Sequence, residues 1–235
     1  MKNRILIGAV LACLAMPLAT QAVTTYDANI TAIFGGGNPN GGWTENTENN
    51  FQLALRGKDR TTGATAQPNT LGVYEFNVGD PWNFEFSINS DANGTMSRNL
   101  TTPPLISYLL SVDVDGGLGV SFNTYNPLAY PDNSLGNNST ANGAGVEPGP
   151  AGYAVWNIAQ NSERPIYPPN FIGDGAGIYD FILSAYNGNQ LLNTVSMQVR
   201  VGSSQAVPDG GGTLALLGIG VVGLFGAKRK LWPAH

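Results

Sequence analysis

The chain is 235 residues long and has a formal net charge of −5, with one cysteine, Cys13, and one histidine, His235. Residues 23–206, argued below to form the folded body, carry fifteen acidic and six basic side chains, a net charge of −9. This balance argues against a nucleic acid partner, because phosphate binding needs a basic surface. A body without His or Cys also lacks the residues that most acyl-transfer and zinc sites use, so we do not expect an enzyme.

The first 22 residues have the three parts of a secretory signal peptide. Lys2 and Arg4 supply a positive start, residues 5–16 form an apolar run, and residues 20–22 read Thr-Gln-Ala, a small-x-small cleavage site. The apolar run is short for a membrane span, so cleavage is favoured over anchoring. The mature protein is expected to begin at Val23.

Alternating apolar and polar residues mark three strands in the body, at residues 82–89, 106–115 and 191–201. Such alternation predicts one apolar face against a core and one face in water. A run that is apolar on both faces, residues 178–186, predicts a central strand, and residues 24–34 predict an edge or first strand. Weaker patterns predict further strands at residues 51–55, 73–76, 120–122 and 153–158.

Eight or nine strands without a helical pattern of useful length predict an all-β domain. Residues 35–50 and 126–152 are rich in polar and turn-forming residues and are expected to be surface loops. No linker divides the body. Residues 23–206 are therefore expected to form one antiparallel β-sandwich of jelly-roll type.

One loop is a candidate for calcium, the only cofactor that the sequence suggests. Asn89, Asp91 and Asn93 stand at positions 1, 3 and 5 of a loop with Gly94 at position 6, as in an EF-hand. Position 12 is Leu100 in place of the bidentate Glu. The alternative is a plain turn between strands, in which Asn and Asp tolerate left-handed backbone conformations.

A second acidic stretch holds Asp113 and Asp115, whose carboxylates leave the same face of a strand about 7 Å apart. Such a pair fits half of a calcium site or the acid and base of a glycosidase, for which Glu85 and Asp180 are further candidates. The alternative is a solvated strand end before a glycine turn.

Trp43 follows two glycines in a polar stretch and has no alternating partners. An exposed loop tryptophan could stack on the face of a sugar while neighbouring Asn and Asp side chains bind the hydroxyls. The alternative is a ring that folds back as a lid on the core. Trp43 is thus the candidate for a glycan contact.

The last segment, residues 207–235, consists of a turn-forming motif, an apolar helix and a basic stop. Its continuous apolar run, residues 214–227, would be roughly 21 Å long as a helix, a marginal span for a bilayer. The basic triplet is expected to hold its end in the cytoplasm and leave the body outside. The motif covers residues 207–212, the helix 213–227 and the stop 228–230, and the defining residues are Val207, Pro208, Asp209, Lys228, Arg229 and Lys230.

This tail resembles the PEP-CTERM sorting signal of Gram-negative secreted proteins, in the variant with Val-Pro-Asp followed by glycines. The resemblance implies removal of the tail by an exosortase and delivery to the cell surface or to an extracellular polysaccharide matrix. The body resembles a group of uncharacterised secreted PEP-CTERM proteins, a resemblance that implies no catalytic residues. The matching blocks are residues 37–42, 82–91, 138–145, 157–162 and 177–186.

The sequence therefore predicts an exported surface or matrix protein with a structural or adhesive role in exopolysaccharide or biofilm. The expected partners are an exosortase, exopolysaccharide and, before processing, the membrane through the tail helix. The alternative is a carbohydrate-binding or calcium-dependent, lectin-like module. A glycan-active enzyme is the third hypothesis. All three stay open at this point because a fold alone does not determine function.

Overall fold

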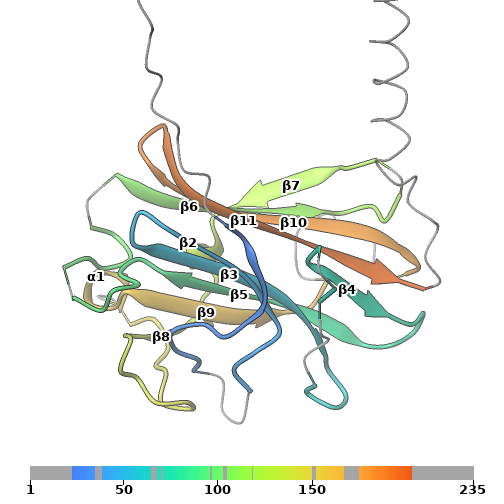
Figure 1. Ribbon diagram of the computed structural model, residues 1–235, viewed down its shortest axis with the longest axis horizontal. Coiled ribbons are helices and arrows are strands. Elements are labelled where there is room, and N and C mark those ends of the chain that lie inside the picture. Colours follow the sequence, from blue (N-terminus) through green and yellow to red (C-terminus); the bar gives the residue numbers. More distant parts are fainter. Residues whose placement is uncertain are drawn as a thin grey trace, which may run out of the picture.

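The computed structural model describes residues 23–34, 39–64, 68–69, 71–95, 97–102, 105–117, 119–149, 152–166 and 175–202. These residues form two β-sheets stacked face to face, with a short helix at one side (Figure 1). The expected signal peptide, residues 1–22, and the expected sorting tail, residues 207–235, lie outside the described residues. In the part of the chain that is described, no helix is long and apolar enough to cross a membrane.

Sheet A has six antiparallel strands in the order β1-β2-β3-β5-β9-β8. Strands β2 and β3 are joined by Asn49 and Asn50, whose φ angles are 52° and 66°. Two adjacent positive φ angles fit a type I′ hairpin turn, which Asn adopts readily. The strands are β1 Thr25–Ala28, β2 Trp43–Glu48, β3 Phe51–Asp59, β5 Trp82–Asn89, β8 Ser134–Gly136 and β9 Ile158–Glu163.

Sheet B has five strands in the order β4-β11-β10-β6-β7. Strand β4 runs parallel to β11, whereas the other pairs are antiparallel. The predicted antiparallel β-sandwich is therefore confirmed for every described strand pair except β4–β11, which is parallel because β4 reaches sheet B by a crossover from β3 in sheet A. The strands are β4 Val73–Phe76, β6 Ile106–Asp113, β7 Phe122–Tyr125, β10 Gly177–Asn187 and β11 Gln190–Val201, and the helices are η1 Pro127–Ala129 and α1 Gly152–Val155.

The main core lies between the two sheets and is rich in aromatic rings. Phe84 of β5 meets Phe181 of β10 with ring centroids 5.0 Å apart, and Trp82 stacks on Phe76 at 5.7 Å. Each such side chain contributes roughly 1.5–3 kcal/mol when it is fully buried. Strands β3, β5, β10 and β11 supply most of the core because their alternate residues point inward.

Strands β3 and β5 of sheet A are buried on both of their faces, which corrects the expectation that strand 82–89 has a wet side. Residues 30–34 and 39–42, here called the strap, lie against its outer face and bury Ile30 and Phe34. Gln160 on β9 accepts a hydrogen bond from Phe34 N and donates one to Ala32 O. The outward residues of β5, Glu85, Ser87 and Asn89, are consequently buried although they are polar.

The strongly alternating stretches are confirmed as β5, β6 and β11, and residues 178–186 are confirmed as the central strand of sheet B, β10. The predicted strand at 153–158 is wrong: residues 152–155 form α1, and the strand begins at Ile158. Strands β2 and β8 lie within segments that were expected to be loops. The jelly-roll connectivity stays a prediction.

Candidate functional site

Trp43 does not present its ring to solvent. It is the first residue of β2, only 2% of its surface is exposed, and the Arg56 guanidinium carbon lies 4.2 Å from its ring centroid. The ring packs with Ile30 and Ile33 of the strap and with Ala54 of β3. The expectation of an exposed loop tryptophan is therefore wrong, since the strap and Arg56 occupy the surroundings that a sugar would need.

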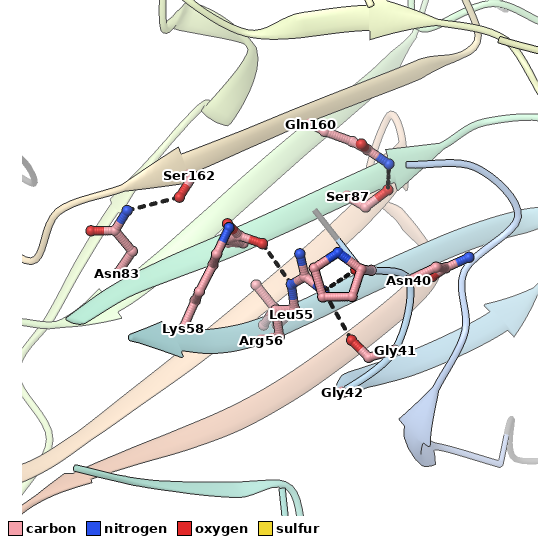
Figure 2. A network of polar contacts seen from close by, with 12 residues as sticks. Asn40, Gly41, Gly42, Leu55, Arg56, Lys58, Asn83, Ser87, Gln160 and Ser162 are labelled. Carbon is pink, nitrogen blue, oxygen red and sulfur yellow. Dashed lines mark hydrogen bonds and ion pairs between the residues drawn. The ribbon is translucent and has the colours of Figure 1, made fainter. Parts of the chain in front are cut away.

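The same region holds a buried ion pair that ties the strap to sheet A (Figure 2). Arg56 is fully buried; its Nε donates to Glu85 Oε2 at 2.5 Å, and its Nη1 donates to the carbonyls of Pro39 and Gly41 at 3.0 and 2.9 Å. Lys58 Nζ lies 3.4 Å from Glu85 Oε1. Because the guanidinium reaches two strap carbonyls, we assign this network to holding the strap in place.

A small cleft of about 190 Å³ opens beside this network, between the strap and β9. Glu85 and Trp43 line it together with Gln160, whose amide already binds the strap and Ser87 Oγ. Arg56 Nη2 is buried without a hydrogen-bond partner. In the cleft, Gln160, Asn161 and Ser162 make structural hydrogen bonds, whereas Trp43 Nε1 is buried without a hydrogen-bond partner.

The first calcium candidate forms a hydrogen-bonded turn. The Asp91 carboxylate accepts hydrogen bonds from Asn50 Nδ2 at 2.7 Å, from Thr95 Oγ1 at 3.0 and 3.1 Å and from Ser97 N at 3.1 Å. Asn89 Oδ1 accepts hydrogen bonds from Asp91 N and from Asn157 Nδ2. Protein donors therefore take the oxygens that calcium would need, which is the geometry of the turn alternative.

Asn93 is exposed beside this turn, and its backbone N–H donates to Asn50 Oδ1 at 2.8 Å. Asn138 Nδ2 donates to the carbonyls of Asp91 and Ala92, at 3.1 and 3.2 Å. The network thus joins three loops at one end of sheet A.

The second candidate, Asp113 and Asp115, caps the turn between β6 and β7. Asp113 Oδ1 accepts a hydrogen bond from Ser121 N at 2.9 Å, and Asp115 Oδ1 accepts one from Gly117 N at 3.0 Å. Asp113 Oδ2 is buried without a hydrogen-bond partner. Among the described residues there is no group of three or more Asp, Glu, His or Cys side chains that could hold a metal ion.

Glu163 is a titratable residue that sequence reasoning missed. It lies at the end of β9, is buried, and its Oε1 has no hydrogen-bond partner. Burial, with the nearby charge of Asp132, raises the pKa of Glu163 from 4.5 to about 7. Nothing in the local sequence distinguishes it, because its burial comes from contacts made by distant segments.

The outer face of sheet B differs from that of sheet A because polar residues of its central strands reach solvent. Strand β11 alternates exposed or half-buried residues with buried ones from Leu192 to Val201, whereas Leu191, expected on the apolar face, is exposed. A groove of about 440 Å³ crosses this face, with Leu71 and Phe122 among its most exposed lining residues, at 74% and 41%. Its polar lining consists of Asp180, Ser196, Gln198 and Arg200.

Three of these polar side chains form a connected row. Gln198 Nε2 donates to Asp180 Oδ1 at 2.9 Å, and Arg200 Nε donates to Gln198 Oε1 at 2.8 Å. The three groups are planar and are held against one another, so a ligand would meet donors and acceptors that are already oriented. This groove is the candidate binding site of the body.

Comparison with known proteins identifies the tail. Residues 206–231 match the family model of the VPDSG-CTERM motif. A search of curated proteins finds no match to the chain. The chain therefore carries a PEP-CTERM-like exosortase sorting signal, which marks it as an exported protein of the secreted or cell-surface class.

Proposed function

We propose that the protein is a surface or extracellular-matrix component of a Gram-negative bacterium, with a structural or adhesive role in exopolysaccharide or biofilm. The observation that carries this proposal is the sorting signal at residues 206–231, attached to a packed sandwich with an open, grooved face. A signal of this kind supports an address outside the cell. A rigid body with a polar binding face suits non-covalent contact with a polymer.

The proposed itinerary divides the chain into three parts. Residues 1–22 direct export and are removed, residues 23–206 fold as the sandwich, and residues 207–235 anchor the chain transiently in the membrane until an exosortase cuts it. The apolar helix proposed at 213–227 and the basic stop at 228–230 support this anchoring step.

We also propose that the body acts without catalysis. The absence of His and Cys from residues 23–206 supports this, as does the use of Asp113 and Asp115 in backbone hydrogen bonds. A carboxylate pair for glycan hydrolysis would need one carboxyl with a raised pKa in a cleft and a second carboxylate opposite it; Glu163, whose pKa is raised, lines neither the cleft beside the strap nor the groove on sheet B.

Fractionation of a producing cell tests the proposed function. The full chain would be expressed in a Gram-negative host with an exosortase and an exopolysaccharide, and the body followed in cells, matrix and free medium. We expect tail-free body in the matrix fraction. The matched control is the chain ending at residue 205, which should be absent from the matrix fraction if the sorting signal is what delivers the body there. The proposal is contradicted if the full chain yields body only in the free medium.

A further inference from the structure

We propose that the groove across the outer face of sheet B is a binding site for a neutral oligosaccharide segment. The proposal rests on the proposed function, which places the body among polysaccharides, and it names the part of the molecule that makes the contact. It moves the predicted sugar contact from Trp43 on sheet A to the opposite sheet.

Access to the groove follows from the strand pattern. Asp180 and Ile182 on β10, and Ser196, Gln198 and Arg200 on β11, point away from the core because their neighbours Phe181, Met197 and Val199 point into it. The lining extends from Val73 of β4 to Phe122 of β7, the two edge strands of the sheet. Four strand spacings separate these edges, a distance of about 19 Å. A short oligosaccharide would lie across the strands.

The polar row matches the hydroxyl groups of sugars. Asp180 uses one carboxylate oxygen for Gln198, and Arg200 uses one of its five N–H groups. The remaining acceptors of Asp180 and donors of Arg200 can therefore bind neighbouring hydroxyls, which both donate and accept. Because Gln198 fixes both neighbours, binding would order few side chains.

The apolar lining matches the other surface of a sugar ring. Phe122, with 41% of its surface exposed, offers a ring to the C–H face of a pyranose, and Leu71 and Ile182 extend the apolar lining. The opposite charges of Asp180 and Arg200 cancel within the groove. This favours uncharged sugars over polyuronates, which the body's net charge of −9 would also repel.

Binding of hexasaccharides to the full chain, purified in a detergent without a sugar headgroup, tests the proposal. The probes are neutral hexamers of β-1,4-glucose, β-1,3-glucose, α-1,4-glucose and α-1,6-mannose, with a mannuronate hexamer as the charged counterpart. Calorimetry should detect at least one neutral hexamer, and Phe122→Ala and Gln198→Ala should each weaken its affinity at least tenfold.

The matched control is Leu109→Ala, which removes an apolar side chain, 38% exposed, from β6 outside the groove lining. It should leave the affinity within twofold of the unaltered chain, and all variants should keep the same urea midpoint. The proposal is overturned if no neutral hexamer binds, if only the mannuronate hexamer binds, or if both groove variants bind as before. Matrix retention without hexamer binding would defeat this proposal and leave the proposed function standing.

Discussion

At the scale of single residues, the buried Arg56–Glu85 pair is the most demanding feature of the body. Its charges are offset by each other, by Lys58 and by two strap carbonyls. Removing Arg56 leaves the buried Glu85 carboxylate with Lys58, 3.4 Å away, as its remaining cationic neighbour. We expect Arg56→Met to lower the free energy of unfolding by about 3 kcal/mol in urea titrations.

Two further variants separate the charge effect from lost packing. Arg56→Met combined with Glu85→Met should cost less than Arg56→Met alone, because the unpaired carboxylate is gone. Arg98→Met, which removes a half-buried arginine bonded to the carbonyl of Asn49, should cost less than about 1 kcal/mol. If Arg56→Met and Arg98→Met lower the free energy of unfolding equally, the buried ion pair stabilises the fold no more than an ordinary half-buried arginine does.

Glu163 should make the stability of the body depend on pH. Its pKa is raised from 4.5 to about 7, so the folded state binds the proton more tightly than the unfolded state does. The contribution of Glu163 to the free energy of unfolding is therefore complete below about pH 4.5 and is lost as the pH rises to about 7. Over this range the free energy of unfolding falls by at most roughly 1.4 kcal/mol per pH unit.

The Glu163→Gln variant tests this sign. Because the amide carries no charge, the urea midpoint of the variant should fall less between pH 4.5 and 7.5 than that of the unaltered protein. Glu75→Gln, at an exposed position of β4, is the matched control and should leave the pH profile unchanged. A steeper loss in Glu163→Gln would contradict the assigned direction.

At the scale of elements, the strap decides which sheet face is open. Gln160 binds Phe34 N, Ala32 O and Ser87 Oγ, so Gln160→Ala leaves buried backbone groups without partners. We expect a loss of about 1–3 kcal/mol and faster hydrogen exchange at the Phe34 amide. The control variant, Gln198→Ala on sheet B, should leave hydrogen exchange at the Phe34 amide unchanged. Equal exchange rates at this amide in the two variants would mean that Gln160 does not hold the strap.

The elements that the sequence predicted well are the strands with strong apolar patterns, β5, β6, β10 and β11. Strand β2 was missed because its inward residues are polar: Thr44 Oγ1 pairs with Tyr74 OH at 3.1 Å, and Asn46 Nδ2 donates to Thr194 O at 2.8 Å. Such residues satisfy their hydrogen bonds across the sandwich, and local sequence does not record these distant partners.

The candidate site was predictable only in its parts. The polar face of β11 was expected, whereas β10 was expected to be apolar on both faces and Asp180 was considered only as a carboxylate. The groove forms where these β10 and β11 residues lie beside Phe122 and Leu71. This arrangement depends on the strand order β4-β11-β10-β6-β7, which brings residues far apart in the chain together. The exposed alternative for Trp43 is wrong for the same reason, since the burial of its ring depends on the strap.

At the scale of the whole molecule, folding and sorting are carried by separate segments. The last described strand, β11, ends at Val201, whereas the sorting match begins at residue 206. Removal of the tail should therefore leave every described strand pairing intact. We expect the chain with residues 206–235 deleted to have the same urea midpoint as the full chain, within error, because it loses no contact of the described core.

Sorting should fail independently of folding when the motif is altered. In an exosortase-containing host, the full chain should lose its tail, which mass spectrometry detects as a mature product ending near Val207. Pro208→Ala combined with Asp209→Ala removes the turn-forming pair without touching the apolar run or the basic stop. The altered chain should keep its tail and stay in the membrane fraction with an unchanged urea midpoint. Normal cleavage of this variant would show that the enzyme reads the apolar helix and basic stop alone, and a lowered midpoint would show that the motif also belongs to the fold.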